Sequence, residues 1–499
     1  MRPSHGAWGV RRRQSSRSRS VRSAPPTTPT GLKKSKRTRR KPPEATGQVK
    51  KPMQSKERCS EPGRSPGVGG AWPDGSRQGS FPGRGQGRYR EALMSPGLRI
   101  LLVTRHRAVV GGVESYLRTL LPLLQARGHA PGLLFEHDAG PGQTRIDEGL
   151  DLPVWSLAAL GRQGALAGVA AWRPERVYQQ GVQDLDLEEA LLERYPALLF
   201  LHAYYGTCIS GMKRHAFPRP VPCERVLGPA CLVHYLPRRC GGRSPITALR
   251  EYHYQQRRLA LIRRYGTVLV GSRAMREEYL RHGLSESQVV CVSLFGDGTP
   301  DPELPAPRPP SGQLLMVGRL TELKGGVELV RALPVARAAL GRELELVVAG
   351  DGPERPRIQQ EAAARRVPVR FAGWVDRAAR EQLMRQADLL AVPSVWPEPF
   401  GLVGVEAGGV GLPAVAFAVG GIPDWCQPGV SGELAPGNPP TPEGLAGAIV
   451  RALSDAGHHA RLREGAWRMA RRFNAEAHVD ALCEHLAPSP SGRGRGVRV

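Results

Sequence analysis

The chain of 499 residues has 71 Lys and Arg against 45 Asp and Glu, a formal net charge of +26. A charge of this size would suggest a nucleic-acid-binding protein if it were spread evenly. However, residues 1–93 hold 23 basic and 5 acidic residues, which leaves 48 basic and 40 acidic residues for the rest of the chain. The chain is 40% hydrophobic, and this composition excludes a collagen, a coiled coil and disorder throughout.

The compartment can be inferred from the apolar runs and the cysteines. No apolar run approaches the ~18 residues of a membrane span, and no hydrophobic segment follows the first arginines as in a secretory signal. Eight cysteines in 499 residues do not form a disulfide scaffold. The sequence therefore predicts a cytoplasmic protein, and a peripheral association with the inner face of the membrane stays open.

The two ends of the chain differ from the rest. Residues 1–93 are rich in Arg, Ser, Pro and Gly, and they are expected to be disordered, as is the Gly/Arg tail 488–499. The aromatic residues of the basic arm are not interleaved with its charge, so no specific nucleic acid is expected as a partner. Met94 directly precedes the first predicted strand, which favours a reading frame that begins at Met94 over a functional arm.

From residue 98 onward, short apolar runs alternate with amphipathic segments, a pattern typical of a parallel sheet covered by helices. Six strands are predicted in the first half: Arg99–Thr104, Gly132–Phe135, Arg176–Gln179, Ala197–Leu201, Thr267–Val270 and Val289–Leu294. Apolar residues from Val113 to Leu124 recur at helical spacing after the first strand, and Gly128 ends this helix.

A second alternation follows a proline-rich linker, Gly296–Gly312. Its predicted strands are Gln313–Val317, Leu344–Ala349, Val369–Ala372, Leu389–Val392 and Ala414–Ala418, with helices over 326–340, 354–365, 376–387 and 400–409. We therefore expect an α/β protein with a first Rossmann-like domain over 94–300 and a second over 312–487. The two would face each other across a cleft, with ligands beyond the carboxyl ends of the strands.

Two Gly-rich loops after predicted strands suit a phosphate. Gly111 and Gly112 begin the first helix, where small residues let an anion approach the backbone N–H groups. Arg319 and Lys324 lie five residues apart after the first strand of the second domain, so a guanidinium fork and a point charge are available to a diphosphate. No strand is followed by G-x-G-x-x-G, which counts against a nicotinamide or flavin enzyme.

The loop W-P-E-P-F-G-L-V-G-V-E-A carries two glutamates separated by seven residues. Glu398 stands between two prolines, and Glu406 lies on the helix that follows. Two roles are therefore open: Glu398 could face a reacting sugar from the loop, and Glu406 could hydrogen-bond a diol from within the helix. The backbone N–H groups of Phe400, Gly401 and Leu402 would meet a phosphate at the start of the helix.

Taken in order, G-G-V-E, G-R-L-T-E-L-K-G, G-D-G-P-E, F-A-G-W-V, E-P-F-G-L-V-G-V-E-A and G-G-I-P-D resemble the motifs of the family 4 retaining glycosyltransferases. The resemblance covers residues 98–485 and is strongest over 313–425. It implies the B-type fold and transfer of a sugar from a nucleotide-diphosphate-sugar donor with retention of configuration. It also implies a saccharide or lipid-linked acceptor in cell-surface polysaccharide or lipopolysaccharide synthesis, and no cofactor or essential metal.

The resemblance also implies roles for the matching residues. Arg319 and Lys324 would hold the donor diphosphate, Glu398 would contact the donor sugar as a catalytic residue, and Glu406 would bind the ribose hydroxyls. The segment A-G-G after Glu406 departs from the family, which commonly has Met-Ala-Cys or Met-Ala-Ala, and it predicts tighter packing of this helix.

In the first domain, the resemblance implies that Gly111 and Gly112 face the transferred phosphate. His202 follows the strand Ala197–Leu201 and matches a histidine that lies near the donor sugar in several members. A lone histidine after a strand is also often structural, so both roles stay open for His202.

Two alternatives stand beside a retaining hexosyltransferase-type enzyme. A nucleotide-sugar 2-epimerase has the same two-domain fold, and release of nucleotide without an acceptor would favour it. A nucleic-acid-binding protein would act through the basic arm, and its affinity would be lost on deletion of residues 1–93.

Half of the cysteines fall within 33 residues: Cys208, Cys223, Cys231 and Cys240, with His215 and His234 among them. Buried thiols, a disulfide or a zinc site are chemically open, but no C-x₂-C pair is present and no metal site is predicted. In its place in the first domain, this segment is expected to shape an acceptor pocket. The arginine-rich helix after it could rest on anionic lipid or on a polyanionic acceptor, but a solvated basic helix is the ordinary interpretation.

Overall fold

The computed structural model describes residues 97–296, 298–306 and 308–487. The predictions for the basic segment 1–93, for Met94 and for the tail 488–499 therefore concern residues outside this part of the chain. Within it, no helix is both long and apolar enough to cross a membrane.

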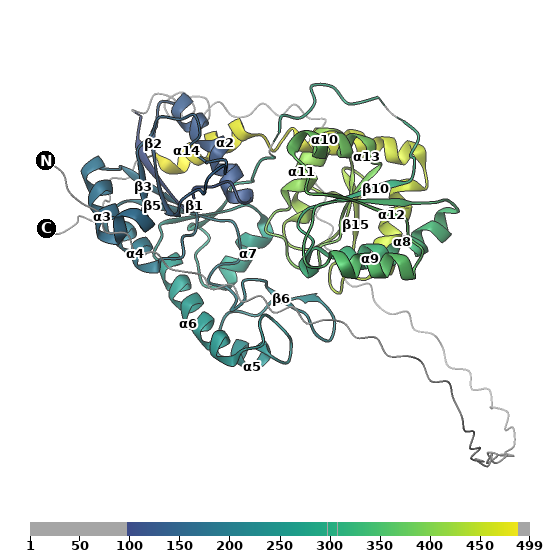
Figure 1. The fold of residues 1–499 in the computed structure, drawn as a ribbon, viewed down its shortest axis with the longest axis horizontal. Helices are drawn as coiled ribbons and strands as arrows, with labels where there is room; N and C mark the ends of the chain where they lie inside the picture. The colour runs from purple at the N-terminus through teal and green to yellow at the C-terminus, as the bar shows by residue number, and fades with distance from the viewer. Residues whose placement is uncertain (1–96, 297, 307, 488–499) are drawn as a thin grey trace, which may run out of the picture. The chain divides into compact units, whose positions relative to one another are not determined.

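The first domain is built on a seven-stranded parallel sheet with the order β3-β2-β1-β4-β5-β8-β9 (Figure 1). Its strands are β1 (Arg99–His106), β2 (Ala130–His137), β3 (Val154–Ser156), β4 (Arg176–Gln179), β5 (Ala197–Leu201), β8 (Thr267–Val270) and β9 (Val289–Cys291). Its helices are α2 (Gly112–Ala126), α3 (Leu157–Trp172), α4 (Leu185–Arg194), α6 (Pro245–Ile262) and α7 (Arg273–Arg281). All six predicted strands are present, and β3 was not predicted.

Both faces of this sheet are covered, which explains why its strands read as continuous apolar runs. In β1, Ile100 and Leu102 belong to the core under α2, whereas Leu101 and Val103 pack with residues of α3 and α4. Successive side chains of a strand point to opposite faces, so a strand buried on both sides needs apolar residues at every position.

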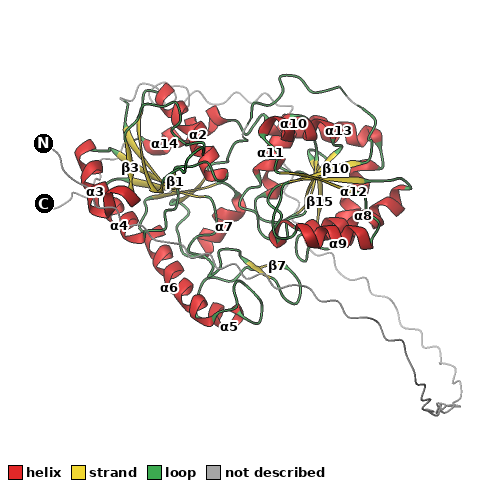
Figure 2. Cartoon of the chain, viewed as in Figure 1, coloured by secondary structure: helices red, strands yellow, loops and turns green. Residues whose placement is uncertain are grey.

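The second domain has a six-stranded parallel sheet with the order β12-β11-β10-β13-β14-β15. Its strands are β10 (Gln313–Val317), β11 (Glu345–Ala349), β12 (Val369–Gly373), β13 (Leu389–Val392), β14 (Ala414–Phe417) and β15 (Gly432–Ala435). Its helices are α8 (Gly326–Leu340), α9 (Arg355–Ala364), α10 (Arg377–Gln386), α11 (Leu402–Gly409), α12 (Pro442–Leu453) and α13 (Ala456–Ala470). Helices lie on both faces of the sheet (Figure 2), so the predicted pair of Rossmann-like α/β domains is confirmed.

The strand order brings distant loops together. In the second sheet the chain runs from β10 outward to β12, and then returns to place β13 on the other side of β10. The loops after β10 and β13 therefore leave the same edge of the sheet side by side. Such a reversal of strand order is where open α/β sheets bind their ligands.

An insertion between β5 and α6 contains two short strands and one short helix, β6 (Arg214–His215), β7 (Val221–Pro222) and α5 (Ala230–Tyr235). Its own core is small and consists of Ile209, Leu227, Tyr235, Ala248 and Tyr252. The last two of these side chains belong to α6, so the insertion is anchored on that helix.

The last helix, α14 (Ala475–Leu486), lies within the range predicted for the second domain but packs against α2 of the first. Its His478 donates from Nδ1 to the carbonyl of Ser293 at 2.8 Å, and Nε2 accepts from the hydroxyl of Tyr116 at 2.8 Å. Asp480 forms an ion pair of 2.6 Å with Arg127. These contacts fasten the end of the chain to the first domain.

We predict that His478 makes the stability of the protein sensitive to acid. Burial lowers the pKa of His478 from 6.5 to about 4, although its bond to the Ser293 carbonyl opposes the shift. The unfolded chain therefore binds more protons than the folded protein between these values, and the free energy of unfolding falls as the pH falls through this window. Denaturant titrations at several pH values from 7 to 4.5 give the free energy of unfolding as a function of pH. The slope of this function should be smaller in His478→Gln, by the equivalent of up to about one bound proton. Equal slopes would contradict the prediction.

Candidate functional site

The carboxylate of Glu398 is the centre of the site. It is buried, and its Oε1 accepts three hydrogen bonds: from Lys324 Nζ at 2.6 Å, from Ser394 Oγ at 2.6 Å and from Trp396 Nε1 at 2.9 Å. All three contacts are made to Oε1. Within the described residues, Oε2 therefore remains available to a hydroxyl of a ligand.

The surroundings keep Glu398 ionised. Burial by itself raises the pKa of its carboxyl. The charge of Lys324 and the three hydrogen bonds lower the pKa by more than burial raises it, so the net pKa lies below its ordinary value. A buried carboxylate that is paired and hydrogen-bonded is a fixed negative charge at neutral pH. Such a group can accept hydrogen bonds from a sugar but holds no proton to donate.

Lys324 reaches Glu398 because two loops touch. Lys324 ends a short 3-10 helix after β10, and the next residue, Gly325, has φ = +66°. A Cβ on Gly325 would lie 1.8 Å from the carbonyl oxygen of Pro393, so only glycine fits there. The amide of Val395 also donates to the carbonyl of Leu323 at 2.9 Å.

The backbone of Glu398 is held from its other side by the G-G-I-P-D motif. The amide of Gly421 donates to the carbonyl of Glu398 at 2.7 Å. Gly420 has φ = +56°, and a Cβ there would lie 2.1 Å from the same carbonyl oxygen. The position of Glu398 is thus fixed by three loops of the second domain.

The start of α11 follows Glu398 closely in the chain. The helix begins at Leu402, two residues later than predicted, and Gly401 before it has φ = +87°. The side chain of Phe400 is buried against Phe473, and its carbonyl accepts from Trp425 Nε1 at 2.7 Å. Among the described residues, no acceptor meets the N–H groups of residues 400–402, as is usual at a helix start.

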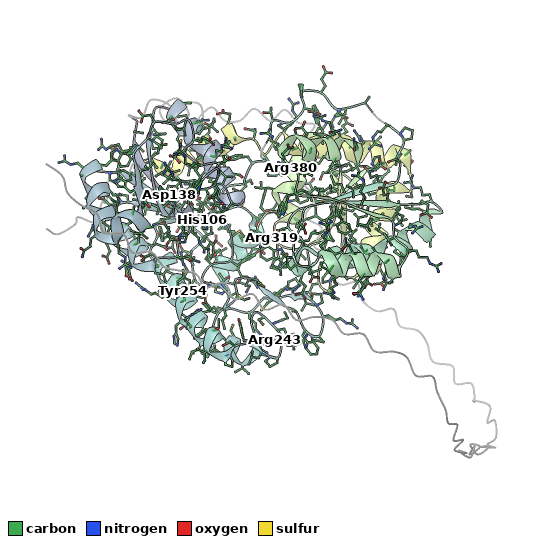
Figure 3. All side chains as sticks on the ribbon, viewed as in Figure 1. His106, Asp138, Arg243, Tyr254, Arg319 and Arg380 are labelled. Carbon is green, nitrogen blue, oxygen red and sulfur yellow. The ribbon has the colours of Figure 1, made fainter. Side chains whose placement is uncertain are left out.

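The two predicted phosphate cations stand in different surroundings. Lys324 is about one-third exposed (35%) and paired with Glu398. Arg319 is exposed, and within the described part of the chain its side chain makes no hydrogen bond or ion pair (Figure 3). Arg319 is thus the cation that can turn toward an incoming anion.

Glu406 does not join the cluster around Glu398. It lines a pocket together with Arg377 and Arg380 of α10 and with the start of the interdomain linker at Gly296 (Figure 3 labels Arg380). Its Oε2 lies 3.4 Å from Nη1 of Arg380. The two glutamates on this segment therefore face different surroundings.

On the first domain, Gly111 and Gly112 lie at the exposed start of α2. A Cβ on Gly112 would meet nothing within 4 Å, so the protein itself does not require glycine at this position. Glu114 of the same motif is buried, and burial raises the pKa of its carboxyl. The open space at Gly112 suits the close approach of a ligand.

His202 follows β5, as predicted, and is held by its neighbours. Its Nε2 donates to Oε1 of Gln180 at 2.7 Å, and its ring packs on Tyr116 and Phe200. Burial and the nearby His478 lower the pKa of His202 to about 3. The ring is therefore neutral at physiological pH and presents Nδ1 as an acceptor.

Three contacts from the first domain reach the loops that carry the site. They are the edge-to-face rings of Tyr204 and Trp396 at 6.4 Å, the ion pair of Arg214 with Glu322 at 2.9 Å and the ion pair of Arg273 with Asp424 at 2.8 Å. Sequence patterns did not identify these contacts. The partners on the second domain lie in motifs noted above from the sequence: Trp396 in W-P-E-P-F-G, Glu322 in G-R-L-T-E-L-K-G and Asp424 in G-G-I-P-D. Their partners on the first domain carried no such signal.

The four cysteines of the insertion come together in the structure. Cys208, Cys223, Cys231 and Cys240 line one pocket together with His215 and His234. All four are free thiols, and Cys240 Sγ lies 3.4 Å from Nδ1 of His215. No three His, Cys, Asp or Glu side chains in residues 97–487, where described, are arranged to hold a metal ion.

Residues 305–469, or 165 of 499 residues, match the family model of group 1 glycosyl transferases. D-inositol 3-phosphate glycosyltransferase of Salinispora tropica is 39% identical over 178 residues, which are 34% of this chain and 36% of that protein. Glycogen synthase of Mycobacterium tuberculosis is 26% identical over 429 residues, or 78% of this chain and 94% of that protein. The chain spans 36–39% of the length of the first three curated relatives that it matches.

Solved structures share the fold. HepE of Anabaena in complex with UDP-glucose aligns with a TM-score of 0.54 at 19% identity, over 78% of this chain and 99% of that one. WaaG, a glycosyltransferase of lipopolysaccharide biosynthesis, aligns with a TM-score of 0.51 at 17% identity over the same shares. The architecture is the B-type arrangement of two Rossmann-like domains.

We predict that the Lys324–Glu398 pair stabilises the fold. Lys324→Met keeps the length of the side chain but leaves a buried carboxylate without its counter-charge. Because Lys324 is partly exposed, we expect a loss of about 1–3 kcal/mol in the free energy of unfolding at pH 7. Denaturant unfolding measures this loss, and Arg319→Gln, which breaks no ion pair, serves as the control. The prediction fails if both variants are equally stable.

Proposed function

We propose that the protein is a retaining glycosyltransferase of the hexosyltransferase type, with a nucleotide-diphosphate-sugar as donor. The observation that carries this proposal is the ionised carboxylate of Glu398 beside Lys324 and beside the unmet N–H groups at the start of α11. An anionic diphosphate and a polyhydroxylated sugar are the two chemistries that such a site complements. The match of residues 305–469 to group 1 glycosyl transferases supports it.

In the proposed complex, the donor diphosphate lies at the start of α11. The N–H groups of Phe400, Gly401 and Leu402 donate to its oxygens, and Arg319 and Lys324 supply charge. Fixed donors and cations stabilise the negative charge that develops on the leaving diphosphate. Gly111 and Gly112 leave room for the phosphate to approach the first domain.

The sugar would then lie against Glu398. Its Oε2 accepts a hydrogen bond from a sugar hydroxyl and orients the ring, while Oε1 stays bound to Ser394 and Trp396. In the retaining route that we propose, the acceptor hydroxyl attacks from the face of the leaving group. The departing phosphate oxygen takes the hydroxyl proton, so no side-chain base is needed.

The remaining predicted residues have supporting roles. Glu406 would accept hydrogen bonds from the ribose hydroxyls in the pocket that it shares with Arg380. His202, neutral and fixed by Gln180, would accept a hydrogen bond from the donor sugar at Nδ1. We propose no cofactor and no essential metal for the reaction, since the cations of the protein supply the positive charge.

For the acceptor, we propose a saccharide or a lipid-linked saccharide in the synthesis of cell-surface polysaccharide or lipopolysaccharide. Two similar proteins support this proposal by their names: a glycogen synthase, and WaaG, a glycosyltransferase involved in lipopolysaccharide biosynthesis. We further propose that the enzyme works in the cytoplasm at the inner face of the membrane.

We predict that the two glutamates affect different kinetic steps. Glu398→Gln removes the charge that orients the sugar, and kcat should fall by roughly a hundredfold or more while donor affinity changes little. Glu406→Ala should mainly raise the KM of the donor, because the ribose loses its acceptor. Steady-state kinetics with a panel of nucleotide-diphosphate-sugars measures both.

Unchanged kinetics in both variants would overturn the assignment of Glu398 and Glu406 to the donor site. The same assays follow the fate of the donor by mass spectrometry and NMR. Transfer to an added acceptor supports the proposal, whereas a donor epimerised at C2 or hydrolysed to free nucleotide without an acceptor contradicts it.

We also predict opposite effects for two glycine substitutions. Gly325→Ala forces a Cβ into the Pro393 carbonyl at a positive φ, so the melting temperature should fall by several degrees. Gly112→Ala meets no atom within 4 Å, so stability should be unchanged, but transfer should drop because the phosphate approaches there. Thermal melts and transfer rates separate the two effects. Full transfer activity in Gly112→Ala would show that the ligand does not come close to this position.

A further inference from the structure

The insertion between β5 and α6 exposes an unusual number of large apolar side chains. Twelve such side chains are exposed among the described residues, and six of them lie between residues 217 and 249. They are Phe217, Val226, Val233, Leu236, Ile246 and Leu249, with Ile246 83% and Val233 73% exposed. Single exposed apolar residues are ordinary, but a concentration of this kind marks an interaction site.

Four of these side chains lie on, or directly after, two helices that pack on each other. Val233 lies on α5 and Leu236 directly follows it, whereas Ile246 and Leu249 lie on the first two turns of α6. Helices α5 and α6 are in contact, at one end of the first domain (Figure 1). We call residues 217–250 the insertion surface.

The insertion surface is also strongly basic. Residues 203–250 contain eight Lys and Arg and a single acid, Glu224. Six arginines of the surface are exposed: Arg219, Arg225, Arg238, Arg239, Arg243 and Arg250. Arg250 pairs with Glu251, but the other five form no ion pair with a described residue (Figure 3 labels Arg243). The guanidinium of Arg239 lies over the ring of Phe217 at 5.0 Å.

We propose that the insertion surface docks on an anionic lipid bilayer. Exposed apolar side chains can enter the boundary between headgroups and acyl chains, while the arginines meet the lipid phosphates. The charge argues against a second copy of this chain as the occupant, because two such basic surfaces repel each other. This inference deepens the membrane location proposed above, and it rests on residues that belong neither to the Glu398 cluster nor to the Glu406 pocket.

The insertion also contacts the catalytic loops. Arg214 of β6 forms the ion pair with Glu322, two residues before Lys324. Tyr204 at the start of the insertion packs on Trp396, which holds Glu398. One segment thus joins the bilayer surface to the loops of the site, which suits an acceptor that is carried by a lipid.

The experiment is co-sedimentation of the full chain with vesicles, without donor or acceptor, so that its outcome does not depend on the proposed catalysis. The vesicles are pure phosphatidylcholine or phosphatidylcholine mixed with phosphatidylglycerol. The test variant is Val233→Ser/Ile246→Ser/Leu249→Ser, which changes no charge. The matched control is Leu160→Ser/Val335→Ser/Val430→Ser, three exposed apolar residues outside the insertion surface.

We expect the wild type and the control to bind the anionic vesicles alike. The test variant should bind roughly tenfold more weakly, because three inserting side chains are lost. The basic segment 1–93 is present in all proteins, so it cannot account for a difference between them. Equal binding of the test variant and the control would overturn the proposal.

A second variant tests the charge. Arg238→Gln/Arg239→Gln/Arg243→Gln should also weaken binding roughly tenfold in dilute salt, and the difference from wild type should shrink as salt screens the arginines. Sedimentation velocity is run on the same proteins. A dimer that dissociates in the apolar variant, or binding to pure phosphatidylcholine equal to that of anionic vesicles, would contradict an anionic bilayer as the occupant.

Discussion

The ion pair of Lys324 with Glu398 sets the geometry of the site. It joins loops that are 74 residues apart in the chain, and it exists because β10 and β13 are neighbours in the second sheet. The pair requires a glycine at position 325, where any side chain would collide with the Pro393 carbonyl. A buried carboxylate is costly without a counter-charge, so the fold around Glu398 depends on this contact.

The same pair bears on the proposed reaction. In the absence of an anion, Lys324 neutralises Glu398, and Arg319 is the exposed cation. A donor diphosphate at the start of α11 would compete with Glu398 for Lys324, so that charge is redistributed as the ligand binds.

Besides holding the proposed site residues Gly111, Gly112 and His202, the first domain contacts these loops. Arg273 with Asp424 and Tyr204 with Trp396 connect it to the segments that hold Glu398. The final helix, α14, returns to the first domain and is fixed there by His478. The chain therefore passes between the domains twice, and both passages lie outside the two sheets.

The sequence by itself determined the strands and the motif positions, because a strand buried on both faces must be apolar at every position and because Arg319, Lys324 and Glu398 follow such strands directly. It did not reveal β3 or β15, which are short and contain few apolar residues. The pairing of Lys324 with Glu398, the return of α14 to α2 and the gathering of the four cysteines around one pocket were decided only by the tertiary structure. These contacts join residues far apart in the chain, and local periodicity reports which face of an element is buried but not what it is buried against.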